Sequence, residues 1–347
     1  MNKIQKIGLT ALAGSLVMVS ANAIEYTVSG GLLTTYSSES QSDSGVVGGR
    51  GIGTATDLAF NASGELDNGF TVDYFMSVDT HKTLSNTSSF MTVGMGSLGT
   101  IRINNDSGSQ ANAIDDVTPN AYNETWDGLA PTTSNPSFFG NQTNEGSVDY
   151  RIATQEIEGI TVNASITYDP DYGQAAPTKA GVTNTTTNGG SGQAYTVQLA
   201  HESGLSTGFG YEQLNGNAGA THHDDETRVT GYVKLAMGGL TAAYQEAYQD
   251  SASAVDAAAT EGADKEATFI GVAYTMGDMT LSYGESELIV QAVSDTAALA
   301  TQELQSFQIA YTMGAMTLSA AMSETGNVGG IAASTYEENT LAVSFAF

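Results

Sequence analysis

Acidic and basic side chains that could act on solutes gather around one long segment of the chain. Residues 105–146 carry six carboxylates: Asp106, Asp115, Asp116, Glu124, Asp127 and Glu145. The basic residues expected to face them are Arg50, Arg102, Arg151, Arg228 and Lys234. Carboxylates held opposite basic groups across water create a transverse field that favours small polar or charged solutes. In an alternative and compatible role, the basic groups hold the segment in place by ion pairs.

Other chemistry has weaker support in the sequence. Four carboxylate clusters would suit Ca²⁺, which takes oxygen ligands: Asp115-Asp116, Asp169-Pro-Asp171, Asp224-Asp225-Glu226 and Glu337-Glu338. None has the spacing of a dedicated Ca²⁺ loop, so solvated surface charge is preferred and no cofactor is predicted. An enzyme would need a motif such as Ser–His or Asp–His. The histidines, His81, His201, His222 and His223, stand in no recognisable motif, so no catalysis is predicted.

The elements that position these residues alternate with period two. In residues 316–323, Met316, Leu318, Ala320 and Met322 fall on one face, and small or polar residues fall on the other. Strict alternation indicates strands with one apolar and one polar face. By this rule Arg102 and Arg151 share the polar face of their strands, and so do Arg228 and Lys234. For Arg50, at the start of the second strand, a place on the same wall is expected.

Connection lengths identify the architecture. Sixteen strand-like runs are predicted, at 24–36, 50–66, 70–80, 87–95, 100–104, 147–155, 160–168, 193–202, 205–213, 227–236, 240–249, 265–275, 279–288, 304–312, 316–324 and 338–347. Tight turns alternate with long loops between them, which is typical of a closed antiparallel up-and-down barrel. The prediction is an all-β transmembrane barrel whose long third loop, 105–146, folds into the lumen.

The start of the chain and its charge restrict the class further. Lys3 and Lys6, an apolar run over 7–19 and Ala21-Asn22-Ala23 predict a secretory signal peptide over 1–23, which leaves a barrel domain over 24–347. The formal net charge of −28 excludes nucleic-acid binding, which needs clustered Lys and Arg. The chain has no cysteine, so no disulfide stabilises it.

Two segments resemble the Gram-negative general porins, especially those of α-proteobacterial type. Gly96-Ser-Leu-Gly-Thr-Ile-Arg102 looks like the family's Gly-x-Phe/Leu-Gly-Thr-x-Arg segment, and a long third loop follows it. The terminal Phe347, behind Phe345, Val343 and Leu341, looks like the family's signal for outer-membrane assembly. Where the family often has Gly-Arg, Asn104-Asn105 stand here, so one wall charge is missing.

The resemblance implies a homotrimer of sixteen-stranded barrels in the outer-membrane lipid, with the third loop as the constriction. The expected function is passive diffusion of small hydrophilic solutes and ions, with a weak preference for cations. One alternative is a porin specific for a particular nutrient. A barrel hydrolase and an acidic secreted adhesin or surface-layer protein are the alternatives from other classes, but an adhesin needs neither the sorted loops nor a terminal Phe.

Overall fold

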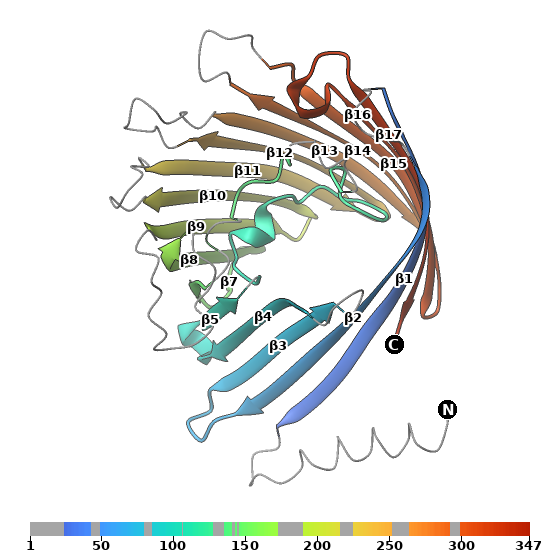
Figure 1. Ribbon diagram of the computed structural model, residues 1–347. Coiled ribbons are helices and arrows are strands. Elements are labelled where there is room, and N and C mark those ends of the chain that lie inside the picture. Colours follow the sequence, from blue (N-terminus) through green and yellow to red (C-terminus); the bar gives the residue numbers. More distant parts are fainter. Residues whose placement is uncertain are drawn as a thin grey trace, which may run out of the picture.

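The chain forms a closed ring of antiparallel strands (Figure 1). The computed structural model describes residues 24–42, 49–79, 85–105, 107–127, 135–140, 143, 146–172, 190–215, 225–251, 264–291 and 299–347. The predicted signal peptide lies outside these residues and stays a prediction. The described part contains no helix that is long and apolar enough to cross a membrane.

The strands follow one another around the ring in chain order. They are β1 (Glu25–Gln41), β2 (Arg50–Glu65), β3 (Thr71–Asp79), β4 (Ser85–Gly94), β5 (Thr100–Asn105), β6 (Val148–Arg151), β7 (Gln155–Ile157), β8 (Ile160–Tyr172), β9 (Gly190–His201), β10 (Leu205–Asn215), β11 (Glu226–Met237), β12 (Leu240–Asp250), β13 (Lys265–Met276), β14 (Met279–Val290), β15 (Gln302–Met313), β16 (Met316–Gly326) and β17 (Thr335–Ala346). Short 3₁₀ turns occupy Gly96–Leu98, Asn112–Ile114 and Val328–Gly330.

The barrel has sixteen strands because β6 and β7 are two parts of one strand. Both pair with β8, but only β6 also pairs with β5. The predicted single run over 147–155 is therefore interrupted at 152–154. The cause lies in the neighbour: β5 begins only at Thr100, after the 3₁₀ turn, so β7 has no partner strand on that side. The other predicted runs are confirmed.

Pairing of the first and last strands closes the barrel. Gly31 lies opposite Ala346, and the register continues to Gln41 opposite Tyr336. The backbones of Gly30 and Phe347 extend this seam by two hydrogen bonds, of 2.8 and 2.9 Å. A closed sheet leaves no unpaired edge, which is a requirement for backbone in hydrocarbon.

The barrel carries its large apolar side chains on the outside. Along β13, Ile270, Val272 and Tyr274 are 42–46% exposed, and the residues between them face inward and are buried. Burial inside comes mainly from the chain between β5 and β6, coloured teal to green, which enters the ring of strands (Figure 1). The predicted inward fold of the third loop is confirmed.

Two-residue turns join several of the strands. Between β13 and β14, Met276 pairs with Met279, so Gly277 and Asp278 form the whole turn. Gly277 has a φ of 59° and the equivalent Gly314 a φ of 61°. Glycine adopts this left-handed backbone without a steric cost, which explains its repetition at the tight turns.

Candidate functional site: the loop inside the barrel

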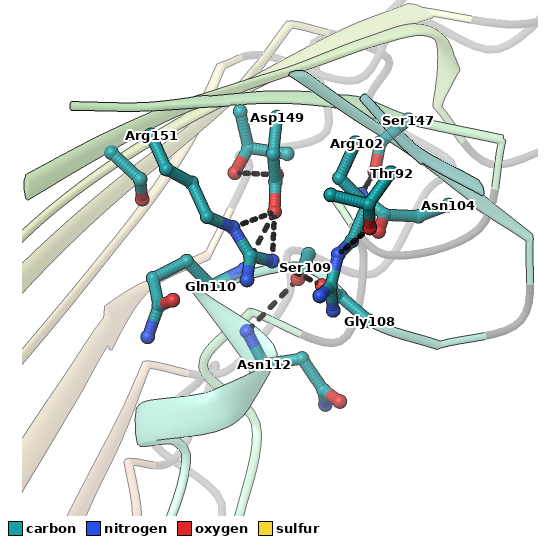
Figure 2. Close-up of polar contacts among 12 residues, drawn as sticks. Thr92, Arg102, Asn104, Gly108, Ser109, Gln110, Asn112, Ser147, Asp149 and Arg151 are labelled. Carbon is teal, nitrogen blue, oxygen red and sulfur yellow. Dashed lines mark hydrogen bonds and ion pairs between the residues drawn. The ribbon is translucent and has the colours of Figure 1, made fainter. Parts of the chain in front are cut away.

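The residues between β5 and β6 (106–147), here called L3, are anchored at their start by two arginines. Arg102 on β5 and Arg151 on β6 both donate to the carbonyl oxygen of Gly108 (Figure 2). Arg151 also forms an ion pair of 2.6 Å with Asp149, whose side chain is fully buried. Asp149 also accepts a hydrogen bond from the backbone N–H of Gln110, at 2.9 Å. This network fixes the point at which L3 turns into the lumen.

Aromatic stacking supports the same anchor. The Phe75 and Phe90 rings stack with their centroids 4.9 Å apart. The Arg102 guanidinium lies over the Phe90 ring, 4.1 Å from its centroid, and its Nε donates to Thr92 at 3.0 Å. Cation–π contact and hydrogen bonds together hold the guanidinium flat against the wall. Arg102 therefore faces L3 and the wall rather than the open channel.

The middle of L3 is held by wall amides and one lysine. Gln245 on β12 donates to the carbonyls of Ile114 and Asp115 and accepts from the N–H of Val117. Lys234 on β11 donates to the Val117 carbonyl at 3.0 Å. Because amide side chains both donate and accept, one glutamine satisfies three backbone groups that lie outside the sheet.

The tip of L3 reaches the opposite part of the wall. Gln308 on β15 accepts from the backbone N–H groups of Ala121, Tyr122 and Asn123, at 2.8–3.2 Å. It also donates to the Asn123 carbonyl at 2.7 Å. L3 thus follows the inner wall from β5 around to β15, and at its start Ser107 also bonds to Ser88 of β4. The remaining wall, formed by β16, β17 and β1–β3, is here called the free wall because it makes none of the L3 contacts described above.

The returning limb of L3 is held by a buried charge pair. Arg228 on β11 donates to the Phe138 carbonyl and lies 3.6 Å from a Glu212 oxygen. Glu212, which is fully buried, accepts from the N–H of Gly140 at 3.1 Å and from the Thr143 hydroxyl at 2.8 Å. A buried carboxylate is tolerated when it is paired and hydrogen-bonded in this way.

Apolar contacts add to this polar attachment. Ile114 and Phe139 of L3 pack with Ala194 and Tyr232 of the wall, and Phe138 packs with Phe269 and its neighbours. Glycines on the inner face of the wall leave the space that these L3 residues occupy. A Cβ at Gly210 would lie 2.4 Å from the Phe139 ring, and one at Gly271 would lie 2.8 Å from the Thr118 Cβ. L3 therefore lies closer to the wall than any side chain there would permit.

Four of the predicted acidic residues form one cluster on L3. Burial, together with the neighbouring carboxylates of Asp115, Asp116 and Asp127, raises the pKa of Glu124 to about 8. Burial also raises the pKa of Asp115 to about 6, against the hydrogen bond that it accepts from Ser137. The pKa values of Asp116 and Asp127 are raised from the usual range for the same reason. The charge of this cluster therefore changes near neutral pH.

The free wall carries acidic side chains as well. Glu39 on β1 lies directly opposite Glu338 on β17, and Asp57 on β2 lies opposite Asp79 on β3. These residues alternate with exposed apolar residues such as Tyr36 and Leu341, which places them on the inner face. These four residues are not among the predicted site residues. The alternation that placed Arg102 would have found them.

Four of the five predicted basic residues face the lumen and contact L3, and one does not. Arg102, Arg151, Arg228 and Lys234 all reach L3, through backbone carbonyls. Arg50 does not: it shares the face of Ile52, which is 77% exposed, so the β2 register turns Arg50 outward. The register thus contradicts the prediction that Arg50 lines the wall. Asp106 and Glu145 lie outside the described residues.

Among the described residues, no ion pair joins an L3 carboxylate to a wall cation, although Lys234 attracts the Asp116 carboxylate electrostatically. The ion pairs among the described residues are those of Arg151 with Asp149 and of Arg228 with Glu212 and Glu226, all within the wall. Within the same ranges, no group of three or more acidic or histidine side chains is placed to hold a metal ion. Ca²⁺ binding, the alternative to the prediction of no cofactor, therefore gains no support from these residues.

Comparison with known proteins agrees with this architecture. A family model described as Gram-negative porin matches residues 8–294. No curated protein sequence gives a significant match. The anion-selective porin from Comamonas acidovorans superposes with a TM-score of 0.66 at 12% identity, over 94% of this chain and 100% of that chain.

Two further solved structures share the barrel. Salmonella typhi OmpF, in a complex with daunomycin, has a TM-score of 0.64 at 13% identity, over 93% of this chain and 97% of that one. A loop-deletion mutant of Vibrio cholerae OmpT has a TM-score of 0.63 at 12% identity, over 94% of this chain and 100% of that chain. At such identities the structures show a common fold, and the family model covers most of the chain. The chain belongs to the Gram-negative porin family and is a channel-forming protein of the outer membrane.

Proposed function

We propose that this porin is a passive diffusion channel for small hydrophilic solutes and that it prefers cations. The observation that carries the preference is the distribution of charge inside the barrel. Glu39, Glu338, Asp57 and Asp79 face the lumen from the free wall, whereas four of the wall's basic residues are engaged with L3. The fold does not set the sign of selectivity, since one structural neighbour is anion-selective.

The physical argument is electrostatic focusing. A water-filled channel lined by one sign of charge between low-dielectric walls raises the local concentration of counter-ions. The preference weakens with salt, because the Debye length falls from about 30 Å at 0.01 M to about 10 Å at 0.1 M. Hydrogen-bonding side chains inside and apolar ones outside favour hydrophilic solutes generally.

The test is the reversal potential of the purified protein in a planar bilayer under a KCl gradient. We expect a shift toward the K⁺ equilibrium potential that grows as the salt is diluted. The double variant Glu39→Gln/Glu338→Gln should reduce the shift. Its control is Glu324→Gln/Glu337→Gln, an acidic cross-strand pair on the outer face. A Cl⁻-directed shift, or equal effects of the two double variants, would contradict the proposal.

The family resemblance also supports a homotrimer. Conductance steps in groups of three in the same recordings would agree with it, and consistently single steps would contradict it.

An alternative function, a pore specific for one nutrient, is favoured by one observation, a polar cavity beside L3.

A further inference from the structure

A cavity of 560 Å³ lies inside the barrel on the turn side of L3. Gln110 of L3 borders it together with residues of β5, β6, β8 and β9, most of which face inward, and with the break between β6 and β7. Its polar lining comprises Thr100, Gln110, Arg151, Thr154, Asn163 and Gln198. The volume falls in the range of small-molecule sites, about 300–1,000 Å³.

The side chains around this cavity are held in place by one another. Gln110 Nε2 donates to Gln198 Oε1 at 3.2 Å, and the Thr154 hydroxyl donates to Asn163 Oδ1 at 2.8 Å. Arg151 is fixed by Asp149 and by the Gly108 carbonyl, and Figure 2 shows it next to Gln110. A polar lining that is already ordered lowers the entropy cost of binding a solute.

Unused donors and acceptors remain around the cavity. Among the described residues, no hydrogen bond occupies Gln110 Oε1, an acceptor, or Asn163 Nδ2 and Arg151 Nη1, which are donors. A carboxylate can only accept, whereas a hydroxyl group both donates and accepts. The positive charge of Arg151 is already balanced by Asp149 at 2.6 Å. The lining therefore suits a neutral solute with several hydroxyl groups better than an anion.

We propose that this cavity is a binding subsite for a neutral, hydroxyl-rich solute of mono- or disaccharide size. The inference rests on the proposed diffusion channel, because such a solute reaches the cavity through the lumen. The acidic lumen repels anions and leaves a neutral sugar unaffected, so the charge of the channel does not oppose the entry of the solute that the cavity suits.

The test is a titration of the multichannel conductance of the mature protein with maltose. We expect a saturable fall in conductance as the sugar occupies the cavity. Asn163→Leu removes a free donor and the contact to Thr154, so the half-saturating maltose concentration should rise about tenfold. Gln110→Leu provides a second variant, on L3 instead of the wall, with the same expected direction. Ser344→Leu, on the inner face of β17 across the barrel, is the matched control and should leave the titration unchanged.

Each contrary result has a distinct meaning. Normal conductance without a saturable maltose effect would overturn the subsite and leave the diffusion channel standing. A saturable effect of glutarate in place of maltose would overturn the solute class. An unchanged half-saturating concentration in both Leu variants would place the sugar elsewhere and overturn the inference. Absence of conductance in folded protein would overturn the channel and the subsite together.

Discussion

At the scale of single residues, the wall cations of this porin act mainly as anchors. Arg102 and Arg151 share one carbonyl oxygen, that of Gly108, and Arg228 and Lys234 hold carbonyls further along L3. Each cation is thereby drawn under the loop. The inner face of the free wall carries the carboxylates of Glu39, Asp57, Asp79 and Glu338.

The titration of Glu124 gives a prediction at this scale. Its raised pKa, about 8, keeps Glu124 largely neutral at pH 7 and charged at pH 9, while Asp115, at about 6, becomes charged between pH 5 and 7. Raised carboxyl pKa values mean that negative charge appears as the pH rises. We therefore expect cation selectivity, measured as reversal potential, to increase from pH 5 to pH 9.

A Glu124 variant separates the titration of Glu124 from that of Asp115. Glu124→Gln should abolish the increase between pH 7 and 9 and leave that between pH 5 and 7. A selectivity that is constant above pH 6, as ordinary carboxyl groups would give, argues against the raised values. So does an unchanged profile in the variant.

At the scale of elements, L3 depends on space that glycines leave on the strands. Gly210 has an ordinary strand backbone, yet a Cβ there would lie 2.4 Å from the Phe139 ring and 2.9 Å from Ile114. The described residues of L3 beyond Ser107 form no strand, so side-chain hydrogen bonds and this packing set their position. A side chain in place of the glycine should displace L3 without opening the barrel.

Gly210→Ala tests this dependence. Overpacking of this kind costs about 1–3 kcal/mol, which we expect to appear as faster proteolysis within L3 and noisier channel currents. Gly231→Ala is the control, because a Cβ at Gly231 has its nearest neighbour 3.8 Å away, on the outer face. Equal protease resistance of both variants would show that L3 is held by its polar anchors alone.

At the scale of the whole molecule, stability depends on the seam between β1 and β17. The strands pair from Gly31 opposite Ala346 to Gln41 opposite Tyr336, and Phe347 adds two backbone hydrogen bonds to Gly30. An open seam would expose unpaired backbone to hydrocarbon, at a cost of several kcal/mol for each unsatisfied group.

Deletion of Phe347 should therefore lower the yield of folded, heat-modifiable barrel in unheated electrophoresis. Phe347→Tyr keeps both backbone bonds and an aromatic ring, so its yield should stay near that of the wild type. Full assembly of the deletion variant would show that the terminal residue is dispensable.

The sequence alone determined the barrel. Alternation with period two and the sorting of short turns from long loops are local properties, readable along sixteen runs, and they also indicated that residues 105–146 would fold inward. Arg102, Arg151, Arg228 and Lys234 were placed on the correct face by the same rule. The acidic pairs of the free wall were equally accessible, since they obey it too.

Only the tertiary structure decided where L3 rests and what holds it. Gln308 binds Asn123, which is 185 positions away, and Gln245 binds Ile114, which is 131 away. A wall glutamine has no local signal that distinguishes it from any other polar residue of the lumen. Arg50 differs, because alternation with Ile52, two residues away, is a local signal that places it on the outer face. Neighbouring residues determine the strand pattern, whereas the position of a docked loop depends on contacts between residues far apart in the sequence.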